Sequence, residues 1–448
     1  MMSLGLRETA ELLQGRMLGR DAHFFGVSTD TRTLVQGNLF IAMEGPRFDG
    51  HRFLGQAAER GAAGALVARP ATRLPAVQVE DPRRAFGRLA AHWRARFRLP
   101  LVAVTGSNGK TTVKEMVAAV LGAGRGPVLA TAGNLNNDIG VPLTLSRLDA
   151  GHRAAVIEMG ANHPGEIAAL AAMACPDIGV ITNAAPAHLA GFGTLAGVAR
   201  AKGELLQGLA PGGTAILNAD DSQYGLWRRM AGDRRVLSFG FGAADVRGDW
   251  VAAGTGGRLE VTTPVGDLAL ALQLPGRHNA ANALAALAVA VALEIPLAAA
   301  AAALAGVRPH PGRLAPCRRR DGGLLLDDSY NANPASLAAA LDSLAGLPGP
   351  TWLVLGDMAE LGPDAPALHA EMGRRAAAAG VQRLYALGPL AAEAAASFGS
   401  GGTGFGDVAA LLQALQRDLD PAVNLLVKGS RAARMERVAQ ALLAGEEA

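Results

Sequence analysis

The chain of 448 residues contains only two cysteines and shows no strong excess of charge of one sign. Cys175 and Cys317 are too few for a disulfide framework, and this scarcity favours a reducing compartment. The formal net charge is +3, and no basic stripe interleaved with aromatic residues appears along the sequence. Nucleic acid is therefore not the expected partner. Half of the residues are hydrophobic and 18% are charged, which predicts a globular protein.

The sequence also lacks an apolar run long enough to cross a membrane. Near its start, Glu8 and Glu11 occupy the region where a secretory signal would need apolar residues. The most apolar stretch, 282–306, is interrupted by Glu294 and Pro296, which favours two helices with a break between them. We therefore expect a cytoplasmic protein without a membrane span.

Length and the spacing of apolar runs predict an α/β protein of three domains. Residues 1–98 carry short apolar runs between polar turns. In residues 99–307, strands and helices alternate as in a doubly wound, mainly parallel sheet, with antiparallel strands added between 240 and 274. The segment 308–313 is expected to be a linker, and residues 308–448 to form a second, Rossmann-like domain. The predicted strands are 39–43, 65–68, 76–79, 101–105, 155–158, 178–182, 214–218, 324–327, 352–355, 383–387 and 424–427.

The most informative segment is an apolar strand, a glycine turn and a helix-compatible stretch at 113–121. Backbone N–H groups of such a turn face phosphates, which requires glycine for close approach. Lys110 adds a positive charge, and Thr111 can place its hydroxyl on Mg²⁺. The turn is shorter than the common phosphate-binding loop, and a plain turn between strand and helix is the alternative. The residues expected to bind nucleotide phosphates are Gly106, Ser107, Asn108, Gly109, Lys110, Thr111 and Thr112.

Three residues of the middle block are expected at the crevice where parallel strands end. Glu158 closes a predicted strand, His188 follows another after a short loop, and Lys202 lies further along. A carboxylate and an imidazole beside a triphosphate are natural Mg²⁺ ligands. Taken singly, Glu158 could form a salt bridge, His188 could cap a loop and Lys202 could be solvated. Their shared location favours the functional interpretation.

Four further polar clusters are candidates for ligand contacts. Residues 134–138 are rich in amides, and Asn279 and Asn282 open the alanine-rich helix; a polar loop and a helix cap are the alternatives. Residues 327–334 place two carboxylates and two amides directly after an apolar strand, where a turn ending in proline is the competing account. Residues 428–431 follow the last predicted strand in the same manner.

Together these motifs resemble the Mur ligases, the ATP-dependent amide-forming enzymes of peptidoglycan assembly, which use the same shortened glycine loop. The resemblance covers nearly the whole chain. Within the family, 133–140, 327–334 and 355–362 resemble the member that adds D-alanyl-D-alanine, and 28–32 and 48–51 resemble its nucleotide-sugar domain. The segments that carry the family resemblance are 105–112, 158–160, 187–189, 201–204 and 277–282.

The resemblance implies ATP and two Mg²⁺ ions as cofactors. Lys110 and Thr111 would hold the phosphates and a first Mg²⁺, with Glu158 near the metals. His188 and Lys202 would support a second Mg²⁺, Lys202 as a carbamate formed with CO₂. Only a neutral amine captures CO₂, so the surroundings of Lys202 must lower its pKa. The residues expected around the rest of the nucleotide are Asn279 and Asn282 for adenine, Asp328 for ribose and Arg313 for the phosphates.

The resemblance also implies the other substrates, UDP-N-acetylmuramoyl-tripeptide (UDP-MurNAc-tripeptide) and D-Ala-D-Ala, and we expect a monomer. Because three substrates must meet between three domains, we also expect domain closure, with the linker at 308–312 as the hinge. The residues expected to face the uridine diphosphate are Ser28, Arg32, Asp49 and His51. Those expected on the dipeptide side are Asn331, Asn333, Lys428, Ser430 and Arg431.

Three alternatives share the phosphate loop. A sister ligase that uses a single amino acid, or a folate polyglutamate ligase, should lack the 327–334 element. A regulatory phosphate-loop switch would hydrolyse ATP without an amine acceptor. A module that only binds would retain its function after Lys110 is replaced.

Overall fold

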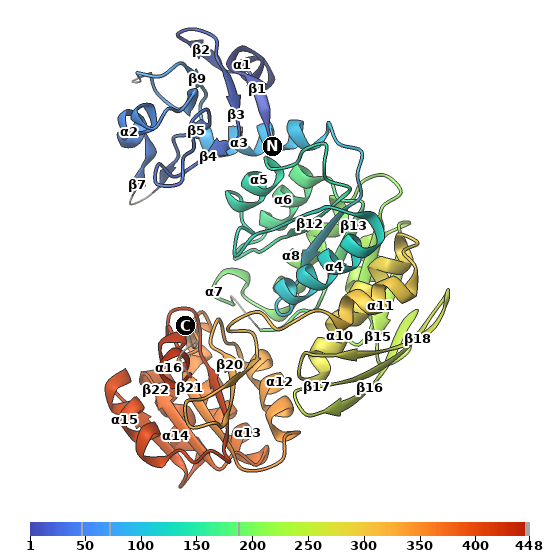
Figure 1. Cartoon of the computed structure of the whole chain (residues 1–448), viewed down its shortest axis with the longest axis vertical. Helices are drawn as coiled ribbons and strands as arrows, with labels where there is room; N and C mark the ends of the chain where they lie inside the picture. Colours follow the sequence, from blue (N-terminus) through green and yellow to red (C-terminus); the bar gives the residue numbers. More distant parts are fainter. Residues whose placement is uncertain (46–47, 71–72, 187–188, 444–448) are drawn as a thin grey trace.

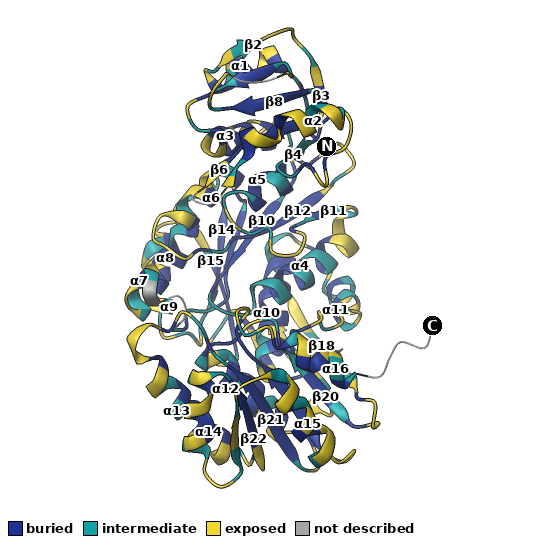
Figure 2. Ribbon diagram, turned by 90° about the vertical axis from the view of Figure 1, so that its left-hand side faces the viewer, coloured by how far each residue is buried: buried dark blue, intermediate teal, exposed yellow. Residues whose placement is uncertain are grey.

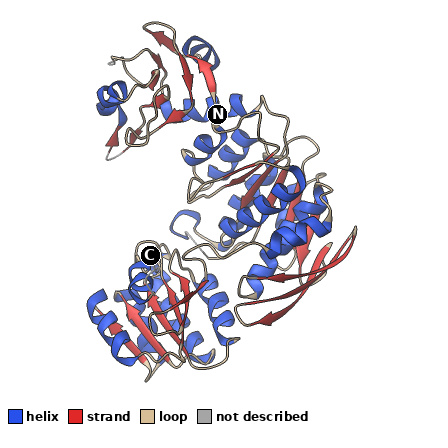
Figure 3. Cartoon of the chain, viewed as in Figure 1, coloured by secondary structure: helices blue, strands red, loops and turns tan. Residues whose placement is uncertain are grey.

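Three main β-sheets follow one another along the long axis of the molecule, each covered by helices (Figures 1 and 3). The structure is a computed structural model that describes residues 1–45, 48–70, 73–186 and 189–443, without the side chains of 189 and 190. The three sheets are mainly parallel. This mixed architecture confirms the predicted α/β fold class.

The N-terminal part of the chain forms a five-stranded sheet in the order β2-β9-β8-β5-β4. Its elements are β1 (Ser3–Gly5), α1 (Leu6–Leu13), β2 (Arg16–Leu18), β3 (His23–Phe25), β4 (Val27–Ser28), β5 (Leu39–Ile41), β6 (Glu44–Gly45), β7 (Phe48–Asp49), η1 (Gly50–Phe53), α2 (Leu54–Glu59), β8 (Gly64–Val67), β9 (Ala76–Gln78) and α3 (Pro82–Arg94). The carboxylate of Asp81 caps α3, with Pro82 in its first turn. Phe86 of this helix shares one hydrophobic core with Leu101, so the N-terminal part packs directly on the middle part.

The middle part forms a nine-stranded sheet in the order β11-β12-β10-β13-β14-β15-β16-β17-β18. Its elements are β10 (Leu101–Thr105), α4 (Lys110–Arg125), β11 (Val128–Ala130), α5 (Gly140–Leu145), β12 (Ala154–Glu158), α6 (Glu166–Ala174), β13 (Ile178–Ile181), α7 (Leu189–Phe192), α8 (Leu195–Gln207), β14 (Thr214–Asn218), α9 (Tyr224–Ala231), β15 (Arg235–Gly240), β16 (Val246–Ala253), β17 (Gly256–Thr263), β18 (Gly266–Leu272), α10 (Arg277–Ala292) and α11 (Leu297–Ala305). β16, β17 and β18 pair antiparallel, as predicted.

Both faces of the middle sheet are buried at β10, β12 and β13, which explains the uninterrupted apolar runs of these strands, whereas buried and exposed residues alternate in β17 and β18. Along β10, Leu101 and Ala103 belong to one core, whereas Val102 and Val104 belong to the core on the opposite face. The second core also contains α4, α10 and α11, so the expected pair of alanine-rich helices covers this face. Figure 2 shows these strands in dark blue between helices with exposed outer surfaces.

The C-terminal part forms a six-stranded sheet in the order β19-β20-β24-β21-β22-β23, parallel except for β19. Its elements are β19 (Ala315–Arg318), β20 (Leu324–Asp328), α12 (Pro334–Ala345), β21 (Thr351–Gly356), η2 (Gly362–Asp364), α13 (Ala365–Ala378), β22 (Arg383–Leu387), α14 (Pro389–Phe398), β23 (Gly402–Phe405), α15 (Val408–Asp418), β24 (Asn424–Lys428) and α16 (Glu436–Leu442). α12, α13 and α14 cover one face, and α15 and α16 the other.

Every strand predicted from the sequence is present, with ends shifted by at most two residues. α4 is longer than the predicted helix because it begins at Lys110, inside the glycine turn. Six strands of the three main sheets were not predicted: β2, β4, β11, β15, β19 and β23. All of them except β15 have at most four residues, which leaves little pattern in the sequence. No helix in the described part of the chain is both long and apolar enough to span a membrane.

Candidate active site

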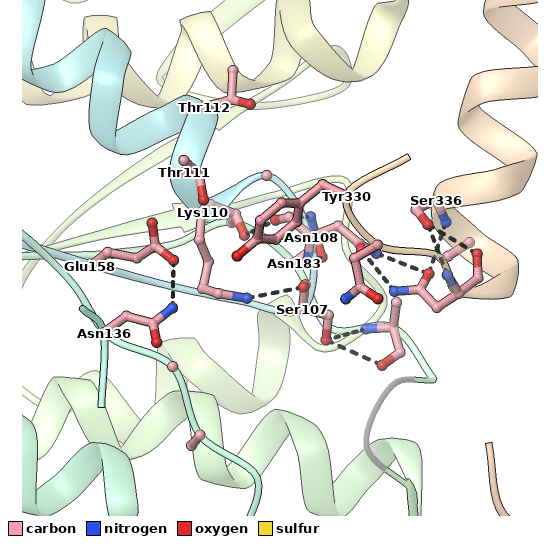
Figure 4. A pocket seen from close by; sticks show the side chains of 18 of the residues that line it. Ser107, Asn108, Lys110, Thr111, Thr112, Asn136, Glu158, Asn183, Tyr330 and Ser336 are labelled. Carbon is pink, nitrogen blue, oxygen red and sulfur yellow. Dashed lines mark hydrogen bonds between the residues drawn. The ribbon is translucent and has the colours of Figure 1, made fainter. Parts of the chain in front are cut away.

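A cavity of about 1130 Å³ lies between the middle and C-terminal parts, with the glycine turn in its wall (Figure 4). The middle part contributes residues from the turn, the 134–138 loop, the end of β12 and the start of α10. The C-terminal part contributes residues from the loop after β20 and from the loop after β24. All of these segments except the start of α10 adjoin the carboxyl ends of parallel strands, so the predicted crevice exists.

Two glycines of the turn have close neighbours that leave no room for a side chain. Gly106 has φ +146°, and a Cβ there would lie 1.9 Å from Thr182 Oγ1. Gly109 has φ +80°, and a Cβ there would lie 2.5 Å from Asn282 Oδ1. Glycine is thus required at both positions by backbone conformation and by close approach.

The residues that follow β13 hold the glycine turn by hydrogen bonds. Ser107 N–H donates to Asn183 O at 2.9 Å, and Asn108 N–H donates to Asn183 Oδ1 at 2.9 Å. Thr182 Oγ1 donates to Asn108 O at 2.6 Å. Thr182 and Asn183 were not predicted as site residues, although their place after a parallel strand was a usable signal.

Lys110 stands at the first position of α4 with its ammonium folded back over the turn. Its Nζ donates to Gly106 O at 2.8 Å and to Ser107 O at 3.2 Å. Burial lowers the pKa of Lys110, while the Glu158 carboxylate opposes that shift. Thr111 Oγ1 accepts a hydrogen bond from Arg313 Nη2 at 3.3 Å, whereas Thr112 is turned away from Lys110 in Figure 4.

Glu158 ends β12 with a buried carboxylate, 2% exposed, whose two oxygens have different surroundings. Oε1 accepts from Asn136 Nδ2 at 2.7 Å. Oε2 is fully buried and has no hydrogen-bond partner within the described part of the chain. An unpaired buried carboxylate oxygen is costly, so this atom fits a cation ligand.

Lys202 lies on α8 and is 2% exposed. Its Nζ lies 5.3 Å from the centre of the Phe192 ring. Burial, and then the Lys110 ammonium, lower the pKa of Lys202 to about 7. The amine therefore loses its proton near neutral pH, which a carbamate requires. His188, its predicted partner at the second metal, lies outside the described residues.

The start of α10 borders the same cavity. Asn279 and Asn282 are buried; Asn282 Nδ2 donates to Asn279 Oδ1 at 3.1 Å, and Asn279 Nδ2 donates to Pro275 O at 2.8 Å. His278 also lines the cavity and was not predicted as a site residue. Burial, and then the Lys428 ammonium, lower the pKa of His278 to about 4, so its imidazole is neutral at pH 7.

Arg313 reaches the cavity from the C-terminal part. Its guanidinium carbon lies 4.0 Å from the centre of the Tyr330 ring, and that of Arg431 lies 5.8 Å from the same ring. A cation over an aromatic face is attracted by the ring. Tyr330, another residue not predicted as part of the site, thus stacks with Arg313 and adjoins Arg431.

A buried ion pair lies behind these residues. Lys428 Nζ donates to Asp328 Oδ2 and, at 3.0 Å, to Asn331 O. Burial raises the pKa of Asp328, against the lowering effect of Lys428. Ser430 Oγ donates to Asp357 O at 2.6 Å, so Ser430 ties the loop after β24 to the loop after β21.

The four residues predicted for the uridine diphosphate lie elsewhere, on the N-terminal sheet and its loops. Ser28 Oγ donates to the backbone of Asp30, and Arg32, largely exposed, pairs with the Asp30 carboxylate. His51 Nδ1 lies 3.0 Å from Asp49 Oδ1. None of these four is among the described residues that line the cavity. Among the described residues of the N-terminal part, Arg83 is the one that lines it.

Comparison with known proteins identifies the family. The catalytic domain of the Mur ligase family matches residues 23–94, the Mur ligase middle domain 104–290, and the Mur ligase glutamate ligase domain 312–431. The chain is 46% identical to the UDP-N-acetylmuramoyl-tripeptide--D-alanyl-D-alanine ligase of Escherichia coli over 99% of both chains. A crystal structure of MurF from Acinetobacter baumannii is 34% identical, with a TM-score of 0.93 over 98% of both chains. MurF ligase from Thermotoga maritima in complex with ADP is 28% identical, with a TM-score of 0.83 over 93% of this chain and 96% of that one. The predicted resemblance is thereby confirmed, and the chain belongs to the Mur ligase family.

Proposed function

We propose that this chain joins D-alanyl-D-alanine to UDP-N-acetylmuramoyl-tripeptide at the expense of ATP, releasing ADP and phosphate. The observation that carries the proposal is the meeting of Lys110, Glu158 and Arg313 at one cavity between the middle and C-terminal parts. Full-length likeness to ligases of that name supports the substrates. We further propose domains at residues 1–98, 99–307 and 308–448, boundaries that fall between the three main sheets.

The chemistry requires an activated acid, because a carboxylate is a poor electrophile. The terminal carboxylate of the tripeptide attacks the γ-phosphorus of ATP, which forms an acyl phosphate and releases ADP. The neutral amine of D-Ala-D-Ala then attacks the acyl carbon, and the tetrahedral intermediate expels phosphate. Lys110 on the phosphate loop and Arg313 from the other side offset the charge of the two anions that meet in the first step. No protein nucleophile is needed, so positioning supplies much of the rate.

We propose that Thr111 and Glu158 hold a first Mg²⁺, because the unpaired Oε2 of Glu158 fits a cation ligand. A bound Mg²⁺ supplies charge neutralisation on the phosphates. His188 and Lys202 are proposed for a second Mg²⁺, with Lys202 as a carbamate. The pKa of about 7 for Lys202 supports this assignment, since carbamylation converts a repelling ammonium into an anionic oxygen ligand.

The remaining assignments concern the adenosine of ATP, the dipeptide and the uridine diphosphate. Asn279 and Asn282 are proposed for adenine and Asp328 for ribose. Residues proposed for the dipeptide side are Asn331, Asn333, Lys428, Ser430 and Arg431; those for the uridine diphosphate are Ser28, Arg32, Asp49 and His51. The latter set lies on the N-terminal domain, so the extended UDP-MurNAc-tripeptide would reach from there to the phosphate loop.

A ligation assay tests the proposed function. Purified protein with Mg²⁺, ATP, UDP-MurNAc-tripeptide and D-Ala-D-Ala should release phosphate and form the pentapeptide nucleotide, detected by mass spectrometry. Omission of either D-Ala-D-Ala or the tripeptide substrate should stop phosphate release, which excludes a regulatory switch that only hydrolyses ATP. Single amino acids in place of the dipeptide should give little product, which excludes a sister ligase. Loss of product in Lys110→Ala, with the fold retained, excludes a module that only binds. Absence of pentapeptide with all reactants present overturns the proposal.

A further inference from the structure

We propose that Asn136 is a positioning residue that orients Glu158, and that Arg83 of the N-terminal domain fixes the loop that carries it. Asn136 holds one oxygen of the Glu158 carboxylate and leaves the other directed to a divalent cation. The inference rests on the proposed function for the identity of the cation site. It adds two residues to that site for which the family motifs implied no role.

The first observation is that the two carboxylate oxygens of Glu158 have different surroundings. Asn136 Nδ2 donates to Oε1 at 2.7 Å, while Oε2 has no hydrogen-bond partner in the ranges that the structure describes. Figure 4 shows Asn136 beside Glu158, on the side of Lys110 away from Thr112. With one oxygen held, rotation of the carboxylate is restricted and Oε2 remains in a defined position.

The chemistry of the donor matters as much as its position. Lysine or arginine at position 136 would pair with Glu158 and offset the negative charge that attracts a cation. An amide donates a hydrogen bond without adding a charge. Asn136 can therefore orient the carboxylate while the full negative charge stays available to the metal. Partners of this kind, one step removed from the metal, commonly set ligand geometry.

The backbone of Asn136 is tied to the same strand end. Gly160 N–H donates to Asn136 O at 2.8 Å, two residues after Glu158. A Cβ at Gly160 would lie 3.0 Å from Asn136 Cγ, so the loop and the strand end are in close contact. Within the loop, Asn137 Oδ1 accepts from Gly140 N at 2.9 Å. The side chain of Asn136 thus projects from a backbone with little freedom.

The loop is also held from the N-terminal domain. Arg83, at the start of α3, forms two contacts of 2.5 Å with Asp138: Nη2 with Oδ1 and Nε with Oδ2. A two-pronged arginine–carboxylate pair gives geometric definition as well as attraction. Asp138 lies two residues after Asn136. Arg83 thus links the N-terminal domain to the loop that carries Asn136.

Metal binding without turnover tests the inference. Mn²⁺ binding to the wild-type chain with a non-hydrolysable ATP analogue is measured by electron paramagnetic resonance and compared with Asn136→Leu, which has similar size and no donor. We expect the Kd for Mn²⁺ to rise about tenfold to a hundredfold. Binding of ADP in the presence of EDTA should change less than about twofold, a difference that a merely structural loss would not produce. Asn136→Gln, which keeps the donor, should recover part of the Mn²⁺ affinity.

Arg83→Ala tests the contact between Arg83 and Asp138. Arg84→Ala is its matched control on the same helix, because Arg84 contacts Asp81 and does not line the cavity. Arg83→Ala should weaken Mn²⁺ binding several-fold, and Arg84→Ala should leave it unchanged. Equal Mn²⁺ affinity in wild type and Asn136→Leu, with the same circular dichroism, overturns the role of Asn136. Equal effects of the two arginine variants overturn the role of Arg83. If Mn²⁺ binding behaves as expected but wild type forms no pentapeptide, the proposed function fails while the positioning role stands.

Discussion

Asn108 of the phosphate loop and Asn333 at the start of α12 exchange side-chain hydrogen bonds although they are 225 residues apart. Asn333 Nδ2 donates to Asn108 Oδ1 at 2.8 Å, and Asn108 Nδ2 donates to Asn333 Oδ1 at 3.5 Å. Asn333 Oδ1 also accepts from Ser336 N at 2.9 Å and so caps α12. The Asn333 side chain therefore caps the start of α12 in the C-terminal domain and attaches this helix to the loop proposed to hold phosphate.

The Asn108–Asn333 contact predicts a variant that loosens the two domains. Asn108→Ala removes both hydrogen bonds without altering the cap of α12. We expect a larger radius of gyration for the ligand-free chain by small-angle X-ray scattering. We also expect a Kd for ATP raised about fivefold to tenfold, since a net hydrogen bond contributes about 1 kcal/mol. Asn333→Ser tests the contact from its other side and should have the same effects, because serine still caps a helix but is too short to reach Asn108. If Asn333→Ser behaves as wild type in both measurements, the contact does not hold the domains together.

Lys202 predicts dependence on dissolved CO₂ and on pH. Its pKa of about 7, against 10.5 for an ordinary lysine, means that the neutral amine becomes the major form as pH rises through 7. Activity of wild type should therefore fall when CO₂ is removed and return with bicarbonate, and the return should be greater at pH 8 than at pH 6. Lys202→Ala should be inactive and regain some activity with short carboxylates such as acetate. An active Lys202→Ala variant, with no carbamate mass on the wild-type chain, contradicts the assignment.

Tyr330 predicts a graded effect through Arg313. Tyr330→Leu removes the aromatic face under the guanidinium and should lower kcat/KM for ATP about twofold to thirtyfold, the range of a cation–π contact of about 0.5 to 2 kcal/mol. Tyr330→Phe keeps the face and should stay close to wild type. Steady-state kinetics with ATP varied provides the measurement. Equal losses in Tyr330→Phe and Tyr330→Leu, both of which lack the hydroxyl, would show that the hydroxyl, rather than stacking, is what matters.

His278 predicts a slope in stability at mildly acidic pH. Its pKa is lowered from 6.5 to about 4, so between these values the unfolded chain binds a proton that the folded chain does not. The free energy of unfolding should therefore fall as pH drops from 6.5 to 4. His278→Gln should remove part of this slope, measured by urea unfolding at several pH values. Identical slopes in both proteins would mean that His278 is protonated alike in the folded and unfolded states.

The amino-acid sequence by itself determined the eleven predicted strands and the glycine turn with its lysine, although strands such as β11, β15 and β19 could not be predicted from it. Apolar runs such as 101–105 and 424–427 form strands that are buried on both faces. The glycines and the lysine of the turn lie close together in the sequence, within residues 105–112. Local order suffices for such features because backbone conformation and hydrogen bonding to near neighbours set them.

Only the tertiary structure decided which distant side chains meet. Asn136 and Glu158 were both visible in the sequence, but their contact depends on how the loop after β11 returns to the end of β12. Arg83 with Asp138, and Asn108 with Asn333, join separate domains, and no periodicity records such pairs. The physical reason is that these contacts follow from the packing of whole sheets and helices, which the order of residues specifies only through the complete fold.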